Sequence, residues 1–281
     1  METIRYQNRI AVVNDFTGFG RCSLTVEIPV ISSLGVECCP LPTSILSNHT
    51  AFSSWFLDDY TKKMPLYLEE WKKQAVSFDG ILIGFLGSEQ QIEIVKQMIR
   101  EFPKRNGHKT LVIVDPIMGD HGKRYATYTE EMCRQIRQLI EAADILTPNL
   151  TEACILTDTP YKENGWHFLE LSKIAERLLE MGAKKVVVSG ITMGQFIGNL
   201  VCEKGKGEMK LFRSKRIGTE RCGTGDIFSS ILAADAVNGV QFENSVKKAM
   251  KFVKDCILLT EQFSVPETNG VCFEYLLKKL K

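Results

Sequence analysis

The sequence predicts an α/β fold built on a doubly wound, mostly parallel central sheet that is flanked by helices and has an antiparallel edge. Short apolar runs alternate with longer amphipathic stretches along the chain, which is typical of a parallel sheet with helical crossovers. The runs are continuously apolar rather than alternating, as expected of strands that are covered on both faces. The predicted strands are residues 10–13, 81–83, 111–114, 145–146 and 186–188.

Helical patterns lie between and after these runs. One begins at about Thr129, with acidic residues in its first turn, and continues to Ile140. Another occupies residues 168–179, and Gly182 is a suitable residue to end it. Three further helical stretches are expected near the C-terminus, at about 226–238, 243–260 and 273–280.

The antiparallel edge is predicted from residues 195–202 and 208–212, which have the pattern of a hairpin around the Lys/Gly turn 204–207. No internal repeat, low-complexity tract or Pro/Ser-rich linker interrupts the 281 residues. That length suits one large α/β domain. We therefore expect residues 1–281 to form a single domain.

The composition excludes several classes of function. Lys and Arg number 35 against 34 Asp and Glu, a net charge of +1, which gives no indication of a nucleic-acid partner. No apolar run approaches the roughly 20 residues of a membrane helix, and the polar residues 1–8 do not resemble a signal peptide. The nine cysteines include no CxxC pair, which disfavours a zinc or thioredoxin-like site. We expect a cytoplasmic protein with reduced thiols, no membrane association and small-molecule partners.

The strongest local signal is the run Gly223, Thr224, Gly225 and Asp226, directly before an apolar helical stretch. Glycine lets the backbone approach a ligand, and the amide groups at a helix N-terminus form an anion hole. Asp226 at the rim is placed to accept a proton from a substrate hydroxyl. The alternative is that Asp226 only caps the helix and that the glycines make a tight turn. Taken alone, these four residues do not separate the two interpretations.

Two further polar groups follow predicted strands. Thr147, Pro148 and Asn149, with Glu152 three residues later, come after strand 145–146, and Asp115 opens the sequence DPIMGD. In parallel sheets, ligands bind beyond the carboxyl ends of the strands, and amide and carboxylate oxygens suit magnesium waters and phosphate. The alternatives are a helix start with Pro148 at its first position and a simple turn at Asp115.

Two motifs are weaker. The sequence GFGRCS at 18–23 follows the first predicted strand and imitates a dinucleotide fingerprint, but Ser23 replaces its third glycine. No GxxxxGK[ST] phosphate loop occurs. The sequence SNHT at 47–50 is a dense polar run between apolar segments, and an exposed loop is its alternative interpretation.

The order of these signals resembles the ribokinase-like superfamily. It consists of a glycine-rich segment after the first strand, SNHT at 47–50, DPIMGD at 115–120 with TPNLTE at 147–152, and GTGD at 223–226. SNHT together with DPIMGD narrows the resemblance to the pyridoxal (vitamin B6) kinase branch, and the resemblance extends over about 9–260. It implies a ribokinase-like fold and transfer of phosphate from ATP to the 5′-hydroxymethyl group of pyridoxal, pyridoxamine or pyridoxine. It also implies Mg²⁺, a monovalent cation (K⁺ or Na⁺) and a homodimer.

The resemblance implies roles for individual residues. Asp226 is implied as the catalytic base, with an anion hole of Gly223, Thr224 and Gly225. The residues implied in ATP and magnesium binding are Asp115, Thr147, Asn149, Glu152 and Ser189, with Mg²⁺ held by Glu152 and Asp115 through water. The residues implied in substrate binding are Asp15, Ser47, Thr50, Phe85 and Tyr125.

Two features depart from the family pattern. Asp15 stands where the family commonly has a small hydroxyl residue that contacts the vitamin. Residues 121–125, which resemble the mobile lid of the family, form a shorter segment than is usual there. Three alternatives therefore stay open. A hydroxymethylpyrimidine kinase shares the fold and GTGD, but SNHT disfavours it. The others are an NAD-dependent oxidoreductase, which the missing third glycine disfavours, and a nucleotide-binding scaffold without activity, which Asp226 disfavours.

Overall fold

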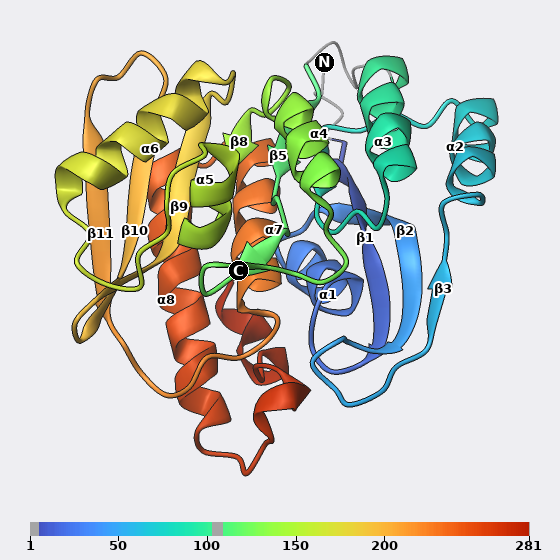
Figure 1. Ribbon diagram of the computed structural model, residues 1–281. Coiled ribbons are helices and arrows are strands. Elements are labelled where there is room, and N and C mark those ends of the chain that lie inside the picture. Colours follow the sequence, from blue (N-terminus) through green and yellow to red (C-terminus); the bar gives the residue numbers. More distant parts are fainter. Residues whose placement is uncertain (1–5, 103–108, 281) are drawn as a thin grey trace, which may run out of the picture.

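A nine-stranded sheet is the centre of the computed structural model, which describes residues 6–102 and 109–280 (Figure 1). Its strands are β1 (Arg9–Phe19), β2 (Glu37–Asn48), β3 (Leu57–Asp59), β4 (Gly80–Ile83), β5 (Leu111–Val114), β8 (Ile145–Leu146), β9 (Lys185–Met193), β10 (Phe196–Glu203) and β11 (Met209–Lys215). Across the sheet the order is β11-β10-β9-β8-β5-β4-β1-β2-β3. A separate two-stranded sheet is formed by β6 (Gly119–Asp120) and β7 (Lys123–Arg124).

The pairing confirms a mostly parallel sheet with an antiparallel edge. The strands from β2 through β1, β4, β5 and β8 to β9 pair in parallel, and β10 and β11 continue the sheet antiparallel. The hairpin predicted around residues 204–207 is therefore present at the sheet edge. At the other edge, β3 pairs antiparallel with β2.

Helices cover both faces of the sheet. One face carries α2 (Met64–Lys73), α3 (Glu89–Glu101), α4 (Glu130–Ile140), α5 (Leu150–Leu156) and α6 (Phe168–Glu180). The other carries α1 (Leu24–Ser33), α7 (Thr224–Val237) and α8 (Phe242–Thr260). Successive residues of β1 point to opposite faces: Ala11 and Val13 join the first core, and Ile10 and Val12 join the second. Both faces are thus buried, as the continuous apolar runs predicted.

Most predicted boundaries are confirmed within one or two residues. Thr129 caps α4 by accepting a hydrogen bond from the Met132 amide at 3.0 Å. Gly182 follows α6 with a φ of 123°, a conformation that favours glycine.

Other predictions differ from the structure. The strands expected at 186–188 and 208–212 continue to Met193 and Lys215. The strand expected at 10–13 continues to Phe19, because its second half resumes pairing with β2 after a register shift between Asn14 and Phe16. Gly18 therefore lies inside a strand and not after it. The helix expected at 273–280 is a 3₁₀ helix, Glu274–Lys279, closed by i→i+3 hydrogen bonds such as Leu276 N–H to Phe273 O at 2.9 Å.

Within residues 6–102 and 109–280, no helix has both the length and the apolar character needed to cross a bilayer. Residues 1–5 of the polar N-terminal segment lie outside the described residues. All nine cysteines fall within the described ranges, and none forms a disulfide.

Candidate active site

The carboxyl ends of five parallel strands meet at one edge of the sheet. Backbone N–H groups continue the pairing beyond the strands, from Asp115 to Ile83 O at 2.8 Å and from Thr147 to Val114 O at 3.0 Å. The Ser189 N–H similarly donates to Pro148 O at 2.9 Å. The structure thereby places five predicted site residues along this edge. Asp15 and Ser189 lie within β1 and β9, and Phe85, Asp115 and Thr147 follow β4, β5 and β8.

The glycine turn before α7 lies at the same edge. Gly223 is the N-cap of α7 with a φ of 86°, and a Cβ on it would lie 2.3 Å from the Arg21 carbonyl oxygen. Only glycine fits there. Gly225 differs, since a Cβ on it would meet nothing within 4 Å. The first turn of the 14-residue helix therefore presents its free amide groups to open space.

Asp226 is the third residue of α7, so the interpretation of Asp226 as the N-cap is wrong. Its side chain is buried at 8% exposure. Burial raises its pKa to about 6, the nearby charge of Asp15 also raises it, and the amides of Ser23 and Asn14 lower it. A carboxyl group with this pKa is largely ionised at neutral pH and still accepts a proton readily.

Asp115 lies close enough to Asp226 for the two charges to interact. Burial and, after it, the charge of Asp226 together raise the pKa of Asp115 to about 7. The side chains of Ser229 and Thr147 oppose this shift by hydrogen bonding. Sequence reasoning missed Ser229, although its position one helical turn after Asp226 was a usable signal.

Asn149 and Glu152 form a capping box at the start of α5. The Asn149 side chain accepts from the Glu152 amide at 2.9 Å, and Glu152 Oε2 accepts from the Asn149 amide at 2.8 Å. The interpretation as a helix start is therefore confirmed, but Pro148 precedes the cap instead of occupying the first helical position. Glu152 Oε1 also accepts from the Met118 amide at 3.1 Å. Burial raises the pKa of Glu152 well above its usual range, and the charge of Asp115 adds to this.

The donor set of Asp115 and Glu152 fits a magnesium ion. The charged groups that shift the pKa values of these two carboxyls are all acidic, so a cation would relieve their mutual repulsion. Among the described residues, no three His, Cys, Asp or Glu side chains come together as a direct ligand group. Mg²⁺ commonly retains several waters and binds proteins through one or two carboxylates, which matches this arrangement.

Asp15 is buried beside this cluster, with both carboxylate oxygens engaged. Thr17 Oγ1 donates to Oδ2 and Ser23 Oγ donates to Oδ1, each at 2.7 Å. Burial raises the pKa of Asp15, and the two hydroxyl groups lower it. Ser23 is the N-cap of α1 with a φ of 53°, so the Asp15 side chain links the middle of β1 to the start of α1.

The remaining predicted residues divide into two groups. Phe85 packs edge-on against Tyr128, with ring centroids 6.0 Å apart, and Tyr125 lies within electrostatic reach of Glu152, which together with burial raises the pKa of its phenol. Ser47 and Thr50 are not brought against this cluster. The Ser47 hydroxyl donates to Asn48 Oδ1 and accepts from the Phe56 amide, and Thr50 is exposed in the turn after β2.

The glycine segment 18–23 borders a surface pocket, but the Cβ side of Gly20 is occupied by another part of the chain. A Cβ on Gly20 would lie 2.5 Å from His49 Cδ2, and His49 Nε2 lies 2.6 Å from the Thr268 carbonyl oxygen. A dinucleotide fingerprint needs this glycine face free for a pyrophosphate. His49 blocks this face at Gly20, and Ser23 replaces the third glycine, so the segment fits the oxidoreductase alternative poorly.

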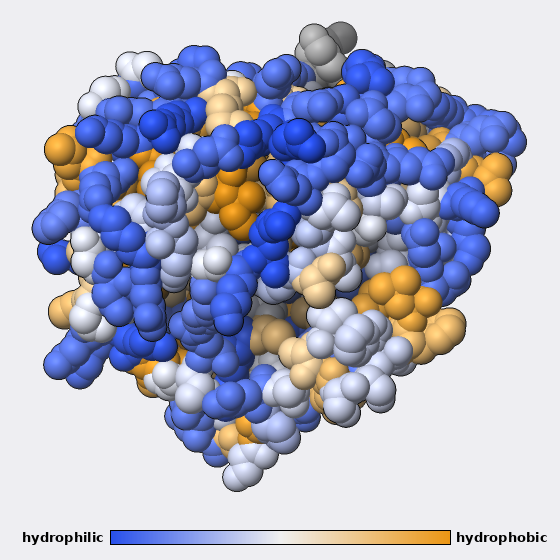
Figure 2. Space-filling view, in the orientation of Figure 1, coloured by the Kyte–Doolittle hydropathy of each residue, from blue (hydrophilic) through white to orange (hydrophobic). Residues whose placement is uncertain are grey.

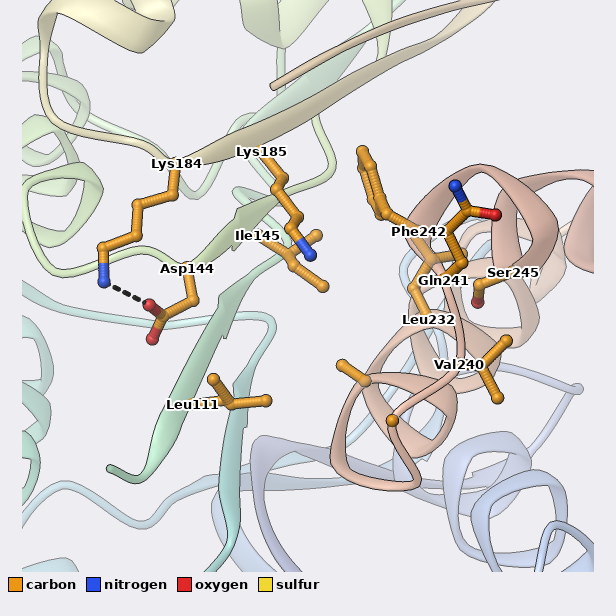
Figure 3. A pocket seen from close by; sticks show the side chains of 12 residues that line it. Leu111, Asp144, Ile145, Lys184, Lys185, Leu232, Val240, Gln241, Phe242 and Ser245 are labelled. Atoms are coloured by element: carbon orange, nitrogen blue, oxygen red, sulfur yellow. Dashed lines mark hydrogen bonds and ion pairs between the residues drawn. The ribbon is translucent and has the colours of Figure 1, made fainter. Parts of the chain in front are cut away.

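A pocket lies at the opposite end of the sheet (Figure 3). It is bordered by Leu111, Ile145 and Lys185, which stand at the amino ends of β5, β8 and β9, and by Phe242 at the start of α8. Asp144 at its rim pairs with Lys184 at 2.7 Å. None of the predicted site residues lines this pocket.

Comparisons with known proteins agree with this geometry. Residues 58–272 match the profile of the phosphomethylpyrimidine kinase family. A Bacteroides thetaiotaomicron protein assigned as a phosphomethylpyrimidine kinase superposes with a TM-score of 0.94 at 33% identity, over 100% of this chain and 96% of that chain. A second crystal form of that protein, solved with pyridoxal, superposes with a TM-score of 0.92 at 33% identity, over 98% of this chain and 96% of that chain.

Curated relatives include vitamin B6 kinases and a thiamine biosynthetic enzyme. A pyridoxine/pyridoxal/pyridoxamine kinase of Bordetella avium is 27% identical over 86% of this chain and 82% of its own length. A bifunctional thiamine biosynthetic enzyme of Arabidopsis thaliana is 26% identical over 91% of this chain. This chain spans 48% of that plant enzyme and 58% of a Caenorhabditis elegans relative.

The family match covers most of the chain, and the structural match at 33% identity covers all of it. The chain belongs to the phosphomethylpyrimidine kinase family, and its fold is that of the pyridoxal kinase structures with which it superposes.

Proposed function

We propose that this chain transfers the γ-phosphoryl group of ATP to the 5′-hydroxymethyl group of a B6 vitamer, through one kinase domain formed by residues 1–281. The observation that carries this proposal is Asp226, a buried carboxyl with a pKa of about 6 at the open first turn of α7. The pyridoxal complex of the Bacteroides relative supports the substrate class.

In the proposed reaction, Asp226 takes the proton of the attacking hydroxyl as its oxygen bonds to the γ-phosphorus. The bond from that phosphorus to the β–γ bridging oxygen breaks, and ADP leaves. The backbone amides of Gly223, Thr224 and Gly225 face the charge that spreads over the phosphoryl oxygens. Mg²⁺ would be held through water by Asp115 and Glu152 and would neutralise phosphate charge. Asn149, Thr147 and Ser189 border the ATP phosphates in this assignment, and a monovalent cation (K⁺ or Na⁺) is a further proposed cofactor.

On the acceptor side, Phe85 is proposed to pack on the pyridine ring, with Tyr125 at the lid. Ser47 and Thr50 are proposed to complete the pocket from the β2 side. Because both oxygens of Asp15 are bonded to Thr17 and Ser23, we propose that Asp15 affects the vitamer through its charge and not through a direct hydrogen bond.

Hydroxymethylpyrimidine kinase is the second candidate, favoured by the family match and by the Arabidopsis relative. An assay of ATP consumption against pyridoxal, pyridoxamine, pyridoxine, hydroxymethylpyrimidine and simple sugars separates the two. We expect the highest kcat/KM with a B6 vitamer, at least about tenfold above hydroxymethylpyrimidine, since each tenfold corresponds to about 1.4 kcal/mol of differential transition-state binding. The reverse order would reassign the chain to pyrimidine phosphorylation.

We also propose that the chain is a homodimer. Exposed apolar side chains occur along β1, β2 and β3 and in the loop before β3: Phe16, Phe19, Ile45, Trp55, Phe56 and Leu57. Figure 2 shows an orange patch on the right of the molecule, on the side where β2 and β3 lie in Figure 1. Contiguous exposed apolar patches commonly mark protein–protein contacts. We propose that a second copy of this chain covers this apolar patch.

Light scattering tests this assignment. Phe56→Glu should convert a dimer to a monomer, because a charge in the middle of a desolvated interface is costly. Leu169→Glu on α6 is the matched control, since Leu169 is 66% exposed and Phe56 is 67% exposed, and it should leave the dimer intact. A monomeric wild-type protein, or equal effects of the two variants, would refute the assignment.

A further inference from the structure

The pocket at the amino ends of the strands is separate from the candidate active site (Figure 3). Its volume is about 330 Å³, and it lies between the starts of β5, β8 and β9 and the turn that joins α7 to α8. Small-molecule sites commonly have volumes of about 300–1,000 Å³. Ser189, the predicted site residue on β9, follows Lys185 by four residues, which places it roughly 13 Å further along the strand.

Most of the pocket wall is apolar. Side chains from β5, β8, α7 and α8 and from the turn between the two helices contribute to it. They are Leu111, Ile145, Leu232, Ala236, Val240 and Phe242. A wall of this kind accommodates the apolar body of a ligand, while a small number of polar groups orient it.

Ser245 supplies one such polar group. It lies in the first turn of α8 with 2% of its surface exposed, and in Figure 3 its oxygen is turned toward Leu232 and Val240, which line the same pocket. The hydroxyl has no hydrogen-bond partner within residues 6–102 and 109–280. Helical hydroxyls commonly donate to the carbonyl four residues earlier, as Ser172 does to Phe168 O at 2.9 Å. Because an unsatisfied buried hydroxyl is destabilising, Ser245 indicates a polar ligand.

Two further features of the wall are electropositive. Lys185 Nζ lies 5.6 Å from the centre of the Phe242 ring, beside the first residue of the 19-residue helix α8. Gln241 is the N-cap of this helix but makes no side-chain capping hydrogen bond. The first amides of α8 therefore keep their positive partial charge at the pocket.

The acidic side chains in and next to this wall already have cationic partners. Asp144 pairs with Lys184 at 2.7 Å and with Lys109 at 2.9 Å. Glu203, which lies opposite Lys185 on β10, and the two acids beside the α7–α8 turn have one lysine each: Glu203 with Lys206 at 2.7 Å, Glu243 with Lys210 at 2.9 Å and Asp235 with Lys248 at 2.6 Å. Lys185 is thus the ammonium group of the pocket that an added anion can engage.

We propose that this pocket binds a small organic anion that has an apolar body of about one ring. The body packs between Ile145 and Phe242, and a carboxylate or phosphate group accepts hydrogen bonds from Lys185, Ser245 and the first amides of α8. This site is distinct from the phosphoryl-transfer site and does not depend on the function proposed for that site.

Ligand-observed NMR titrations with benzoate, phenyl phosphate and benzyl alcohol test the proposal. The three probes share one ring and differ in charge. We expect benzoate or phenyl phosphate to bind at least about tenfold more tightly than benzyl alcohol, because hydrogen bonds to charged groups contribute more than neutral ones. Saturating pyridoxal and a non-hydrolysable ATP analogue should leave this affinity unchanged, since they occupy the other end of the sheet.

Two substitutions identify the polar groups, each with a matched control. Lys185→Gln should weaken binding of the anion about tenfold or more and leave benzyl alcohol unaffected, whereas Lys173→Gln, at an exposed lysine on α6, should have no effect. Ser245→Ala should weaken the anion about 2- to 10-fold. Its control is Ser230→Ala, because Ser230 is also buried and lacks a hydroxyl partner among the described residues but lies outside the pocket wall.

A crystal structure of the wild-type protein with the tighter anion gives a second readout should a variant not fold. The ring should lie between Ile145 and Phe242, with the charged group at Lys185. The proposal would be overturned by a ligand located elsewhere, by displacement with pyridoxal and the ATP analogue, or by equal affinities for the anions and benzyl alcohol. Unchanged anion binding in both Lys185→Gln and Ser245→Ala would also overturn it.

Discussion

Replacing Asp226 with Asn should lower kcat by about 10²–10⁴-fold, the usual contribution of a general base. Asn keeps the size of the side chain and removes the proton acceptor. The affinity for a non-hydrolysable ATP analogue should change little, because the proposed anion hole consists of backbone amides that the substitution leaves in place. Steady-state kinetics with pyridoxal and a titration of the analogue measure the two effects separately.

The pH dependence of kcat/KM is a second test of the role of Asp226. A base acts as its ionised form, so wild-type kcat/KM should fall as the pH drops through about 6, the pKa of Asp226. Asp115, with a pKa of about 7, titrates nearby and broadens this limb. Asp226→Asn should lack the component near pH 6.

Asp235→Asn is the control for loss of a buried acid from α7. Asp235 is 1% exposed, and it pairs with Lys248 at 2.6 Å. This variant should lose stability and keep its kcat. If Asp226→Asn retains near wild-type kcat, Asp226 is a structural residue of the first turn of α7 and the base lies elsewhere.

The placement of the site was predictable wherever it followed from strand direction. Asp115, Thr147 and Ser189 each follow a continuous apolar run, and parallel strands bring their carboxyl ends to one edge of a sheet. The glycine turn before α7 was predictable for a similar reason, since glycines before an apolar helix are a local signal. In both cases the information lies within a few residues of the functional group.

The parts that were not predicted depend on contacts between segments far apart in the chain. Asn14 bonds to Phe85 across the sheet, and no local pattern marks that pair. Strand β2 was missed because Pro40 and Pro42 interrupt its apolar residues. Proline is tolerated there because β3 pairs with β2 only from Ser44 onward, so these positions have a partner strand on one side alone.

The capping box of α5 shows a second reason why the sequence alone does not determine the role of a residue. A cap and a phosphate site both need oxygen atoms and free amides at a helix N-terminus, so the letters TPNLTE do not distinguish them. In the structure Asn149 and Glu152 cap the helix, and Glu152 still faces Asp115. The two interpretations are compatible, and only a substitution that separates charge from capping can weigh them.

Glu152→Gln is that substitution. It removes the negative charge and one of the two acceptors that bind the Asn149 and Met118 amides. We expect kcat to fall by about tenfold or more and the Mg²⁺ concentration for half-maximal rate to rise, since second-shell partners of a metal typically contribute 10–100-fold. Pyridoxal affinity without nucleotide should stay nearly unchanged. Kinetics over a Mg²⁺ series and a vitamin titration measure these quantities.

The Glu170→Gln variant measures the stability cost of a lost cap separately from any effect on Mg²⁺. Glu170 occupies the same capping-box position on α6, where its Oε2 accepts from the His167 amide at 3.1 Å, and it belongs to no part of the candidate site. Loss of a cap costs about 0.5–2 kcal/mol, so both variants should melt at a lower temperature, but only Glu152→Gln should change the response to Mg²⁺. A large loss of pyridoxal affinity in Glu152→Gln, or an unchanged Mg²⁺ response, would show that Glu152 serves the fold and not the metal.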